Sequence, residues 1–189
     1  MGTEIQRKVD VPLGVCILRN DARAALAVAH AIDARFIRVC ILGSPRVTDQ
    51  GLIEGTAAEL LRDRARLQTD IRIWADVDIK HSYALSPHYS LERDAADLVT
   101  RSHADVVIVT GAATGVPIQE SHLSKLRGKI GVPVMVGSGV SEATIGELAG
   151  VSDGLIVGTS LKEGKGPDAL ISLAKTKSLV EALRAGPGR

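Results

Sequence analysis

Aromatic residues are scarce in this sequence, since Phe, Trp and Tyr make up only 2% of its 189 residues. Val, Ile, Leu and Ala must therefore fill the core. Strands and helices of this composition are typical of parallel sheets that are buried on both faces. The scarcity of rings also argues against a protein that stacks single-stranded nucleic acid on aromatic side chains.

An excess of charge of one sign is also missing. The chain has 23 Lys and Arg against 22 Asp and Glu, a formal net charge of +1. This balance removes the usual electrostatic argument for nucleic acid as a partner. No apolar run approaches the roughly 20 residues of a membrane-spanning helix, and residues 1–10 lack the apolar stretch of a signal peptide. We expect a cytoplasmic protein that meets a membrane only peripherally, through a partner.

Cysteine is rare as well, and Cys16 and Cys40 are the only two. Each lies in an apolar run, so we interpret them as buried free thiols in a reducing cytosol rather than as a disulfide or a metal site. His81 and His88 are seven residues apart in a Pro-containing loop, which is not a ligand spacing. The sequence therefore predicts no metal and no cofactor.

One pattern repeats six times: a short apolar run, a loop rich in Gly, Asp or Thr, and a helix rich in Ala or Leu. The predicted strands are residues 11–20, 36–42, 71–80, 105–111, 133–139 and 153–158. The predicted helices are residues 21–34, 56–68, 91–103, 119–130 and 167 to about 185. Strict alternation without hairpin signals predicts a parallel sheet with right-handed crossovers. We expect a single domain over residues 1–189, flexible at 1–10 and 186–189.

The third predicted strand distinguishes a barrel from an open sheet. Its alternate residues from Ile71 are apolar, whereas Asp76, Asp78 and Lys80 share the other face. Helices on both sides of an open sheet would bury these charges at high cost, but a barrel lumen lets them pair with Arg38 and with one another. The prediction is an α/β fold, a TIM-type (β/α) barrel of the phosphate-binding kind with six β/α units present.

Glycine loops follow the last two predicted strands. Paired loops of this kind form the phosphate site of many (β/α) barrels, and a helix beginning near Ser141 would direct backbone N–H groups at the anion. The alternative is that the glycines only permit tight turns. A dinucleotide fingerprint is disfavoured because its third glycine is missing. The candidate phosphate-binding residues are Gly137, Ser138, Gly139, Gly158, Thr159 and Ser160.

Polar residues also gather at the carboxyl ends of the predicted strands, where barrel enzymes carry their chemistry. Carboxylates there would supply acid–base catalysis, and a lysine would act as an electrophile or form a Schiff base. A salt-bridge network without turnover explains the charges of residues 75–81 equally well. The candidate catalytic residues are Asp76, Asp78, Lys80 and Glu54. Further candidate ligand contacts are Arg19, Asn20, Asp49, Gln50, His81, Thr110, Gly111 and Thr114.

Taken together and in order, seven motifs resemble the BtpA/SgcQ family. They are LRND, FIRV, TDQGLIEG, ADVDIKH, ADVVIVTG, VGSGV and DGLIVGTSLK, between about Leu13 and Leu161. The resemblance implies a phosphate-binding (β/α) barrel and, from photosynthetic members, a role in the biogenesis or stability of photosystem I. Other members are named nucleosidases or sugar-operon proteins, and the resemblance implies no established reaction.

Two features depart from the family pattern. Cys40 stands where members usually have asparagine, and members have two further strands at the N-terminus. Six units cannot close an eight-strand barrel without exposing two sheet edges, so we expect a truncated form.

Two functions remain open at this stage. One is an accessory role in the biogenesis of a membrane complex, and the other is an aldolase, isomerase or nucleosidase acting on a phosphorylated sugar or nucleoside. The polar rim favours a ligand site over a pure scaffold. The expected partner is a phosphorylated small molecule, with homo-oligomerisation left open.

Overall fold

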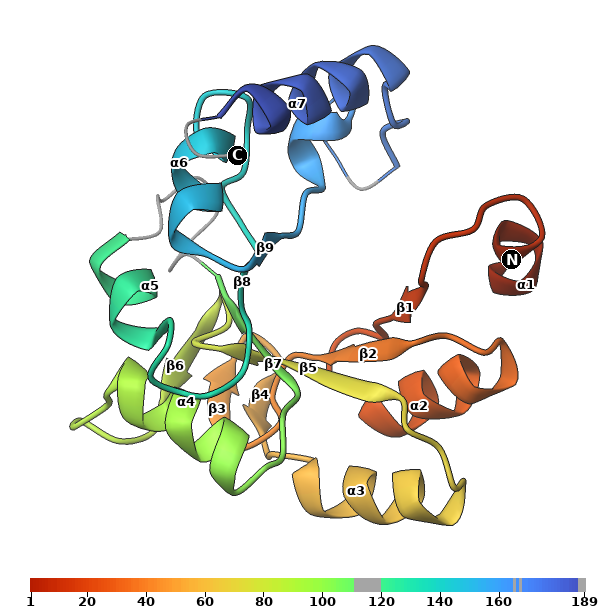
Figure 1. Ribbon diagram of the computed structural model, residues 1–189. Coiled ribbons are helices and arrows are strands. Elements are labelled where there is room, and N and C mark those ends of the chain that lie inside the picture. The colour runs from red at the N-terminus through yellow and green to blue at the C-terminus, as the bar shows by residue number, and fades with distance from the viewer. Residues whose placement is uncertain (111–119, 165, 167, 187–189) are drawn as a thin grey trace.

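A curled parallel sheet of six strands forms the centre of the protein, seen in a computed structural model that describes residues 1–110, 120–164, 166 and 168–186 (Figure 1). Its strand order is β1-β2-β5-β7-β8-β9. These strands are β1 (Gly14–Val15), β2 (Phe36–Val39), β5 (Arg72–Val77), β7 (Val106–Val109), β8 (Val134–Val136) and β9 (Gly154–Leu155). The parallel pairing and the alternation with helices confirm the predicted α/β architecture, although each strand is shorter than expected.

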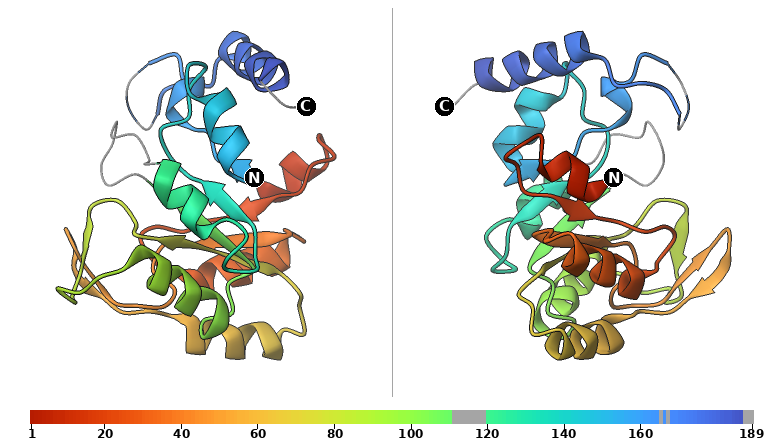
Figure 2. Two further views of the ribbon diagram at one scale, coloured as in Figure 1. Left: turned by 60° about the vertical axis from the view of Figure 1, so that its left-hand side comes forward. Right: turned by 90° about the vertical axis from the view of Figure 1, so that its right-hand side faces the viewer.

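Helices connect successive strands of the parallel sheet, and one further helix lies at each end of the chain, as two further views show (Figure 2). They are α1 (Gly2–Gln6), α2 (Ala22–Ala31), α3 (Ala57–Arg66), α4 (Leu91–Thr100), α5 (Glu120–Leu126), α6 (Ile145–Val151) and α7 (Leu173–Ala185), with a 3-10 helix η1 (Thr159–Leu161) after β9. α2 packs on β1 and β2, and α4 packs on β5 and β7. The carboxylate of Asp21 and the hydroxyl of Ser90 cap α2 and α4, each accepting a backbone N–H of the first turn.

The strand residues divide the sheet into a helix-facing side and an inner side. The predicted helix-facing residues of β5 are confirmed, because Ile73, Ala75 and Val77 are fully buried in the cluster formed with the helices. On the inner side, the rings of Phe36 and Trp74 stack with their centroids 3.9 Å apart. On this inner side the aromatic pair lies between Arg72, at the amino end of β5, and the charges of Arg38 and Asp76 nearer the carboxyl ends.

Two segments predicted as loops form a second sheet, so the expectation of no antiparallel hairpin was wrong. β3 (Arg46–Thr48) and β4 (Gly51–Ile53) form a hairpin, and β6 (Ser82–Ala84) pairs with the other edge of β3. The turn lacks the usual Asn-Gly or Asp-Gly pair. Gly51 instead follows the turn at φ +93°, in the left-handed region that favours glycine. Strands of three residues are also too short to show a recognisable alternation.

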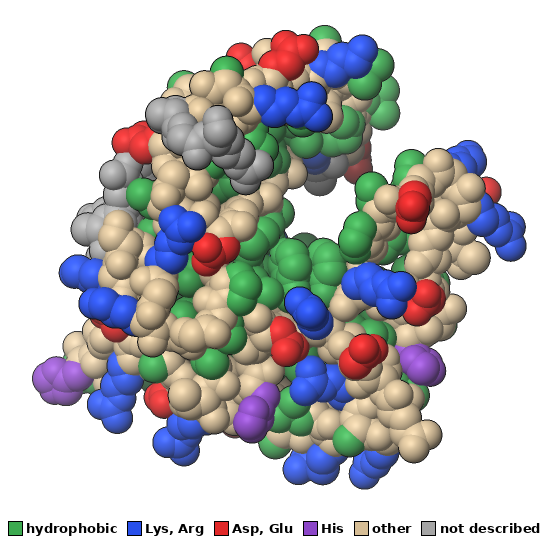
Figure 3. Space-filling model, in the orientation of Figure 1, with side chains coloured by type: hydrophobic (Ala, Val, Ile, Leu, Met, Phe, Trp, Pro, Cys, Tyr) green, Lys and Arg blue, Asp and Glu red, His purple; other side chains and the backbone are tan. Residues whose placement is uncertain are grey.

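The parallel sheet is open, with β1 and β9 as its edges among the described strands. The space-filling view shows a gap between the N-terminal segment and the C-terminal helices, with hydrophobic side chains at its floor (Figure 3). Within the described ranges, no helix is long and apolar enough to cross a membrane.

Candidate functional site

A pocket of about 360 Å³ lies at the carboxyl ends of β1, β2, β5, β7 and β8. We call it the carboxyl-end pocket. Six of the predicted site residues line it: Arg19, Gln50, Lys80, His81, Thr110 and Gly137. The lining is completed by Cys16, Leu18, Arg38, Cys40 and Ile79. The fold thus gathers residues from five strand ends that are far apart in the sequence.

A buried ion pair supports one wall of this pocket. Nε and Nη2 of Arg38 donate to the two carboxylate oxygens of Asp76, at 3.0 and 2.9 Å. The Asp76 side chain is fully buried, whereas 26% of the Arg38 side chain remains exposed. Burial raises the pKa of Asp76, and the hydrogen bonds from Arg38 oppose that shift. Asp76 is therefore a counter-ion that orients Arg38, and it does not itself line the pocket.

Arg19 links the loops that follow β1, β3 and β5 through hydrogen bonds. Its Nη1 donates to Oδ1 of Asp49 at 2.6 Å, and its Nη2 donates to the backbone carbonyls of Lys80 and His81 at 3.2 and 3.4 Å. Its Nε is buried and has no hydrogen-bond partner among the described residues. Arg19 thus places a second cation at the pocket and holds the Lys80 backbone.

Lys80 reaches the pocket because the chain changes direction after β5. The predicted strand extends to residue 80, but β5 ends at Val77, and Asp78 and His81 have positive φ values of 56° and 57°. The hydroxyl of Thr110 donates to the Asp78 carbonyl at 3.2 Å and fixes this turn. The prediction that Asp76 and Asp78 share one face was therefore wrong, since a left-handed residue interrupts the alternation.

The carboxylate of Asp78 pairs with Arg46, a residue that the sequence analysis missed. Arg46 is buried, with only 5% of its side chain exposed, and donates to Asp78 at 2.9 Å and to Asp94 at 3.0 Å. Its guanidinium carbon lies 4.7 Å from the ring centre of Tyr89. These contacts join β3 to the end of β5 and to α4. An arginine in an apparent loop gives no sequence signal of burial.

Several other predicted contacts lie elsewhere. The Asn20 carboxamide donates to the Ile41 carbonyl and accepts from the Ile41 N–H, both at 2.8 Å, so the backbone occupies both of its polar atoms. Asp49 and Glu54 are exposed and do not line the pocket. Gly111 and Thr114 lie outside the described residues.

The two predicted phosphate loops are joined by a hydrogen bond. Ser160 donates its hydroxyl to the Val140 carbonyl at 2.7 Å, and Thr144 donates to the Gly139 carbonyl at 2.9 Å. Gly139 has a φ of +74°. A Cβ at Gly137 would lie 2.7 Å from a methyl group of Ile108, so only glycine fits this strand end. Of the other predicted phosphate-binding residues, Ser138 is buried, whereas Gly158 and Thr159 are exposed.

Two thiols meet in the pocket wall. Cys40 is buried, but Cys16 is exposed, so the expectation of two buried thiols was wrong for Cys16, which follows the edge strand β1. The interaction with Cys40 and the positive charge of Arg38 lower the pKa of Cys16 to about 7, although burial opposes them. The interaction with Cys16 and burial raise the pKa of Cys40. In the part of the chain that is described, no three potential metal-ligating side chains converge.

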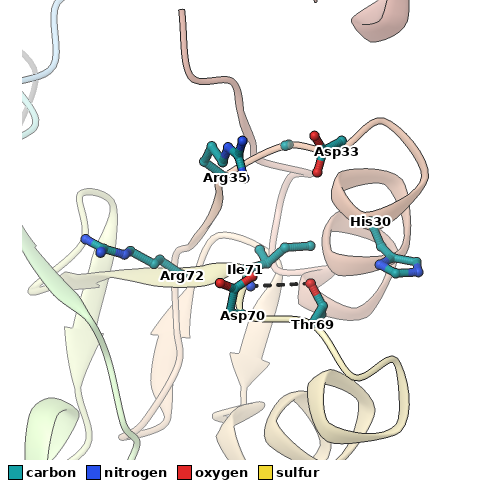
Figure 4. Close-up of a pocket in the computed structure, with 8 residues that line it drawn as sticks. His30, Asp33, Arg35, Thr69, Asp70, Ile71 and Arg72 are labelled. Carbon is teal, nitrogen blue, oxygen red and sulfur yellow. Dashed lines mark hydrogen bonds between the residues drawn. The ribbon is translucent and has the colours of Figure 1, made fainter.

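A second polar pocket, of about 350 Å³, lies at the opposite, amino ends of β2 and β5 (Figure 4). We call it the amino-end pocket. Asp33, Arg35 and Arg72 line it, and all three are exposed. Since (β/α) barrels carry their chemistry at the carboxyl ends of the strands, we assign the candidate site to the carboxyl-end pocket.

Comparison with protein families matches residues 1–185 to the BtpA family. The chain belongs to the BtpA family. Photosystem I biogenesis protein BtpA of Synechocystis sp. is 41% identical over 184 residues, which cover 96% of this chain and 63% of that protein. An uncharacterized protein of Thermococcus kodakarensis is 43% identical over 178 residues, covering 94% and 67%. This BtpA-family chain therefore spans about two thirds of the length of these relatives.

Among solved structures, phosphoribosyl anthranilate isomerase from Thermus thermophilus shares the fold with a TM-score of 0.65. The match covers 97% of this chain and 78% of the isomerase at 11% sequence identity. It confirms the predicted TIM-type class of the BtpA-family chain. At this identity, the likeness concerns the fold alone.

Proposed function

We propose that this BtpA-family chain binds a phosphorylated small molecule in the carboxyl-end pocket. The observation that carries the proposal is the convergence of three cationic side chains, Arg19, Arg38 and Lys80, on one pocket of about 360 Å³. That volume is in the range of small-ligand sites. Arginine is suited to phosphate because its planar guanidinium donates two parallel hydrogen bonds.

The glycine at the end of β8 supports the same ligand. The position of a Cβ at Gly137 would be 3.5 Å from Nη2 of Arg38. Because this position has no side chain, the backbone at the end of β8 packs closely against Ile108 and lies beside the Arg38 guanidinium. The neighbouring loop of Gly158–Ser160 is held against Val140 and would extend this wall.

Within this proposal, Lys80 is the residue that would carry chemistry in an aldolase, isomerase or nucleosidase acting on a phosphorylated sugar or nucleoside. A primary amine can form a Schiff base or polarise a carbonyl group. Asp76 would keep Arg38 oriented toward the ligand. Asp78, which pairs with Arg46, and the exposed Glu54 would take no direct part.

A second function is favoured by the Synechocystis relative, which is named for photosystem I biogenesis. In that function the chain would support assembly of a membrane complex through a protein partner, and turnover at Lys80 would not be needed. Complementation of a Synechocystis strain that lacks its BtpA protein separates the two. The wild-type chain is first shown to complement this strain, and Lys80→Ala should then fail to complement only if the pocket chemistry is required.

Ligand binding is tested by thermal unfolding of the chain with orthophosphate, ribose 5-phosphate and other phosphosugars. A ligand present at 100 times its Kd should stabilise the chain by about 2.7 kcal/mol, a rise in Tm of roughly 5–10 °C. Lys80→Met should abolish the rise, whereas Lys129→Met, at an exposed lysine away from the pocket, should keep it. A folded chain that none of these compounds stabilises would contradict the proposal.

The phosphate loop is tested separately by a matched pair at Gly139. Asp and Asn both tolerate the left-handed conformation of this residue. Gly139→Asp adds a negative charge beside the expected phosphate, whereas Gly139→Asn does not. We expect weaker ligand stabilisation in Gly139→Asp alone. Equal loss in both variants would indicate that Gly139 serves only the turn.

A further inference from the structure

The only two cysteines of the chain lie together in the wall of the carboxyl-end pocket. Cys16 follows β1 and Cys40 follows β2, and these two strands pair in parallel. Both side chains line the carboxyl-end pocket, and the interaction between them lowers the pKa of Cys16 and raises the pKa of Cys40. Two thiols that are 24 positions apart in the sequence thus follow neighbouring strands and face the same pocket.

The two thiols differ in their access to solvent. Cys16 is exposed and belongs to the edge of the sheet, whereas only 4% of Cys40 is exposed. The positive charge of Arg38 favours negative charge on Cys16, whereas the negative charge of Asp76 disfavours it on Cys40. A reagent from solvent therefore meets Cys16 first.

We propose that Cys16 and Cys40 form a redox-active thiol pair that a hydroperoxide oxidises to an intramolecular disulfide. The Cys16 thiolate attacks the terminal oxygen of the hydroperoxide. An S–O bond forms, the O–O bond breaks, and the alkoxide leaves with a proton as the alcohol. The Cys40 sulfur then attacks the Cys16 sulfenic acid, the S–O bond breaks, and the hydroxide leaves with the Cys40 proton as water. Two thiols and one hydroperoxide give one disulfide, one alcohol and one water.

The surroundings of Cys16 match this order of events. A thiolate, not a thiol, attacks the peroxide, and the interaction with Cys40 together with the positive charge of Arg38 favours the thiolate at Cys16. The lowered pKa gives Cys16 a larger thiolate fraction at neutral pH than an ordinary cysteine has. Cys16 should therefore react faster than an ordinary cysteine, by less than the gain in thiolate fraction because a more acidic thiol is a weaker nucleophile. The inference does not depend on the proposed phosphate ligand, although both use the same pocket.

The reaction is tested on the reduced full chain with one equivalent of cumene hydroperoxide at neutral pH. Free thiols are then blocked with N-ethylmaleimide in denaturant, and intact mass is measured without reductant. We expect a monomer that has lost two hydrogens and takes up no maleimide, and dithiothreitol should restore both labelling sites. A covalent dimer, a stable sulfinic acid on Cys16, or two thiols that remain free would each overturn the proposal.

Two variants assign the roles of the thiols. In Cys40→Ser, oxidation should stop at a Cys16 sulfenic acid that dimedone traps. In Cys16→Ser, Cys40 should stay reduced at the same dose because it is buried. Rapid oxidation of Cys40 alone would reverse the assignment. If either variant fails to fold, the wild-type mass measurement still decides whether the disulfide forms.

Discussion

The two ends of β2 and β5 carry pockets of nearly equal volume but different construction. The amino-end pocket is lined by Arg35 and Arg72, both exposed, and Arg72 extends away from Asp33 (Figure 4). The hydrogen bond drawn there is local, from the Ile71 N–H to the Thr69 hydroxyl at 3.4 Å. At the carboxyl-end pocket, Arg19 and Arg38 are each held by residues from other strands or loops.

Loop length explains this difference. At the amino ends, short turns link each helix to the next strand, and three of them contain a left-handed residue other than glycine, namely Asp33, Gln68 and His103. At the carboxyl ends, the segments after β2 and β5 are long enough to form the β3-β4-β6 sheet. Long loops supply partners that hold a cation in place, whereas short turns only reverse the chain. Arginine side chains thus lie at both ends of the strands. Those at the carboxyl-end pocket are held in place by residues from distant segments, and this feature marks the candidate site.

The largest expected effect is at Arg46, the buried cation that anchors the extra sheet. Arg46→Met leaves Asp78 and Asp94 without their cation, and losing one partner of a buried pair costs about 3–5 kcal/mol. Urea unfolding followed by circular dichroism measures this loss. Arg35→Met, in the amino-end pocket, is the matched control and should change stability by less than about 0.5 kcal/mol. Equal losses would remove the distinction between the two ends.

A smaller effect is expected at Asp76, the counter-ion of Arg38. Asp76→Asn should lower the free energy of unfolding by about 2 kcal/mol, because it removes the buried charge partner but keeps a hydrogen-bond acceptor for an arginine that is still partly exposed to solvent. It should also weaken phosphosugar binding, since Arg38 loses its orientation. Asp70→Asn, at an exposed residue of the amino-end pocket, should do neither. Unchanged binding in Asp76→Asn would show that Arg38 does not contact the ligand.

The smallest effect is expected at an amino-end turn and has the opposite sign. Gln68 ends α3 with a φ of +50°, a conformation that glycine adopts without steric cost. Gln68→Gly should therefore raise the free energy of unfolding by about 0.5–1 kcal/mol, measured by the same urea titration. Gln6→Gly, in a short exposed helix, is a control that should not stabilise. If Gln68→Gly instead lowers the free energy of unfolding, the contacts of the Gln68 side chain stabilise the fold by more than its left-handed backbone destabilises it.

Much of the fold follows from local patterns in the sequence. The alternation of Ile73, Ala75 and Val77 predicted the helix-facing side of β5, and Asp21 was placed correctly at the start of α2. Such features depend on neighbours within a few residues, so they are visible without the structure. The glycine loops after β8 and β9 were located for the same reason, although their contact with phosphate stays a prediction.

The residues that make up the site were harder to predict from the sequence. Asp78 was assigned to the face of Asp76, but its left-handed backbone turns it toward Arg46. Nothing near Arg46 in the sequence indicates burial, because its partners Asp78 and Asp94 are 32 and 48 residues away. The hairpin around Gly51 was missed because its turn and its short strands are atypical.

The sequence by itself determined the α/β class, the order of the parallel strands and the helices between them, and the strand ends at which polar residues collect. Periodicity and turn-forming residues encode these features locally. Only the tertiary structure decided that Arg38 pairs with Asp76, that Arg46 is buried, and that Cys16 and Cys40 line the same pocket. Each of these features brings together segments more than 20 residues apart. Their energies depend on burial and on partner geometry, which exist only once the sheet has formed.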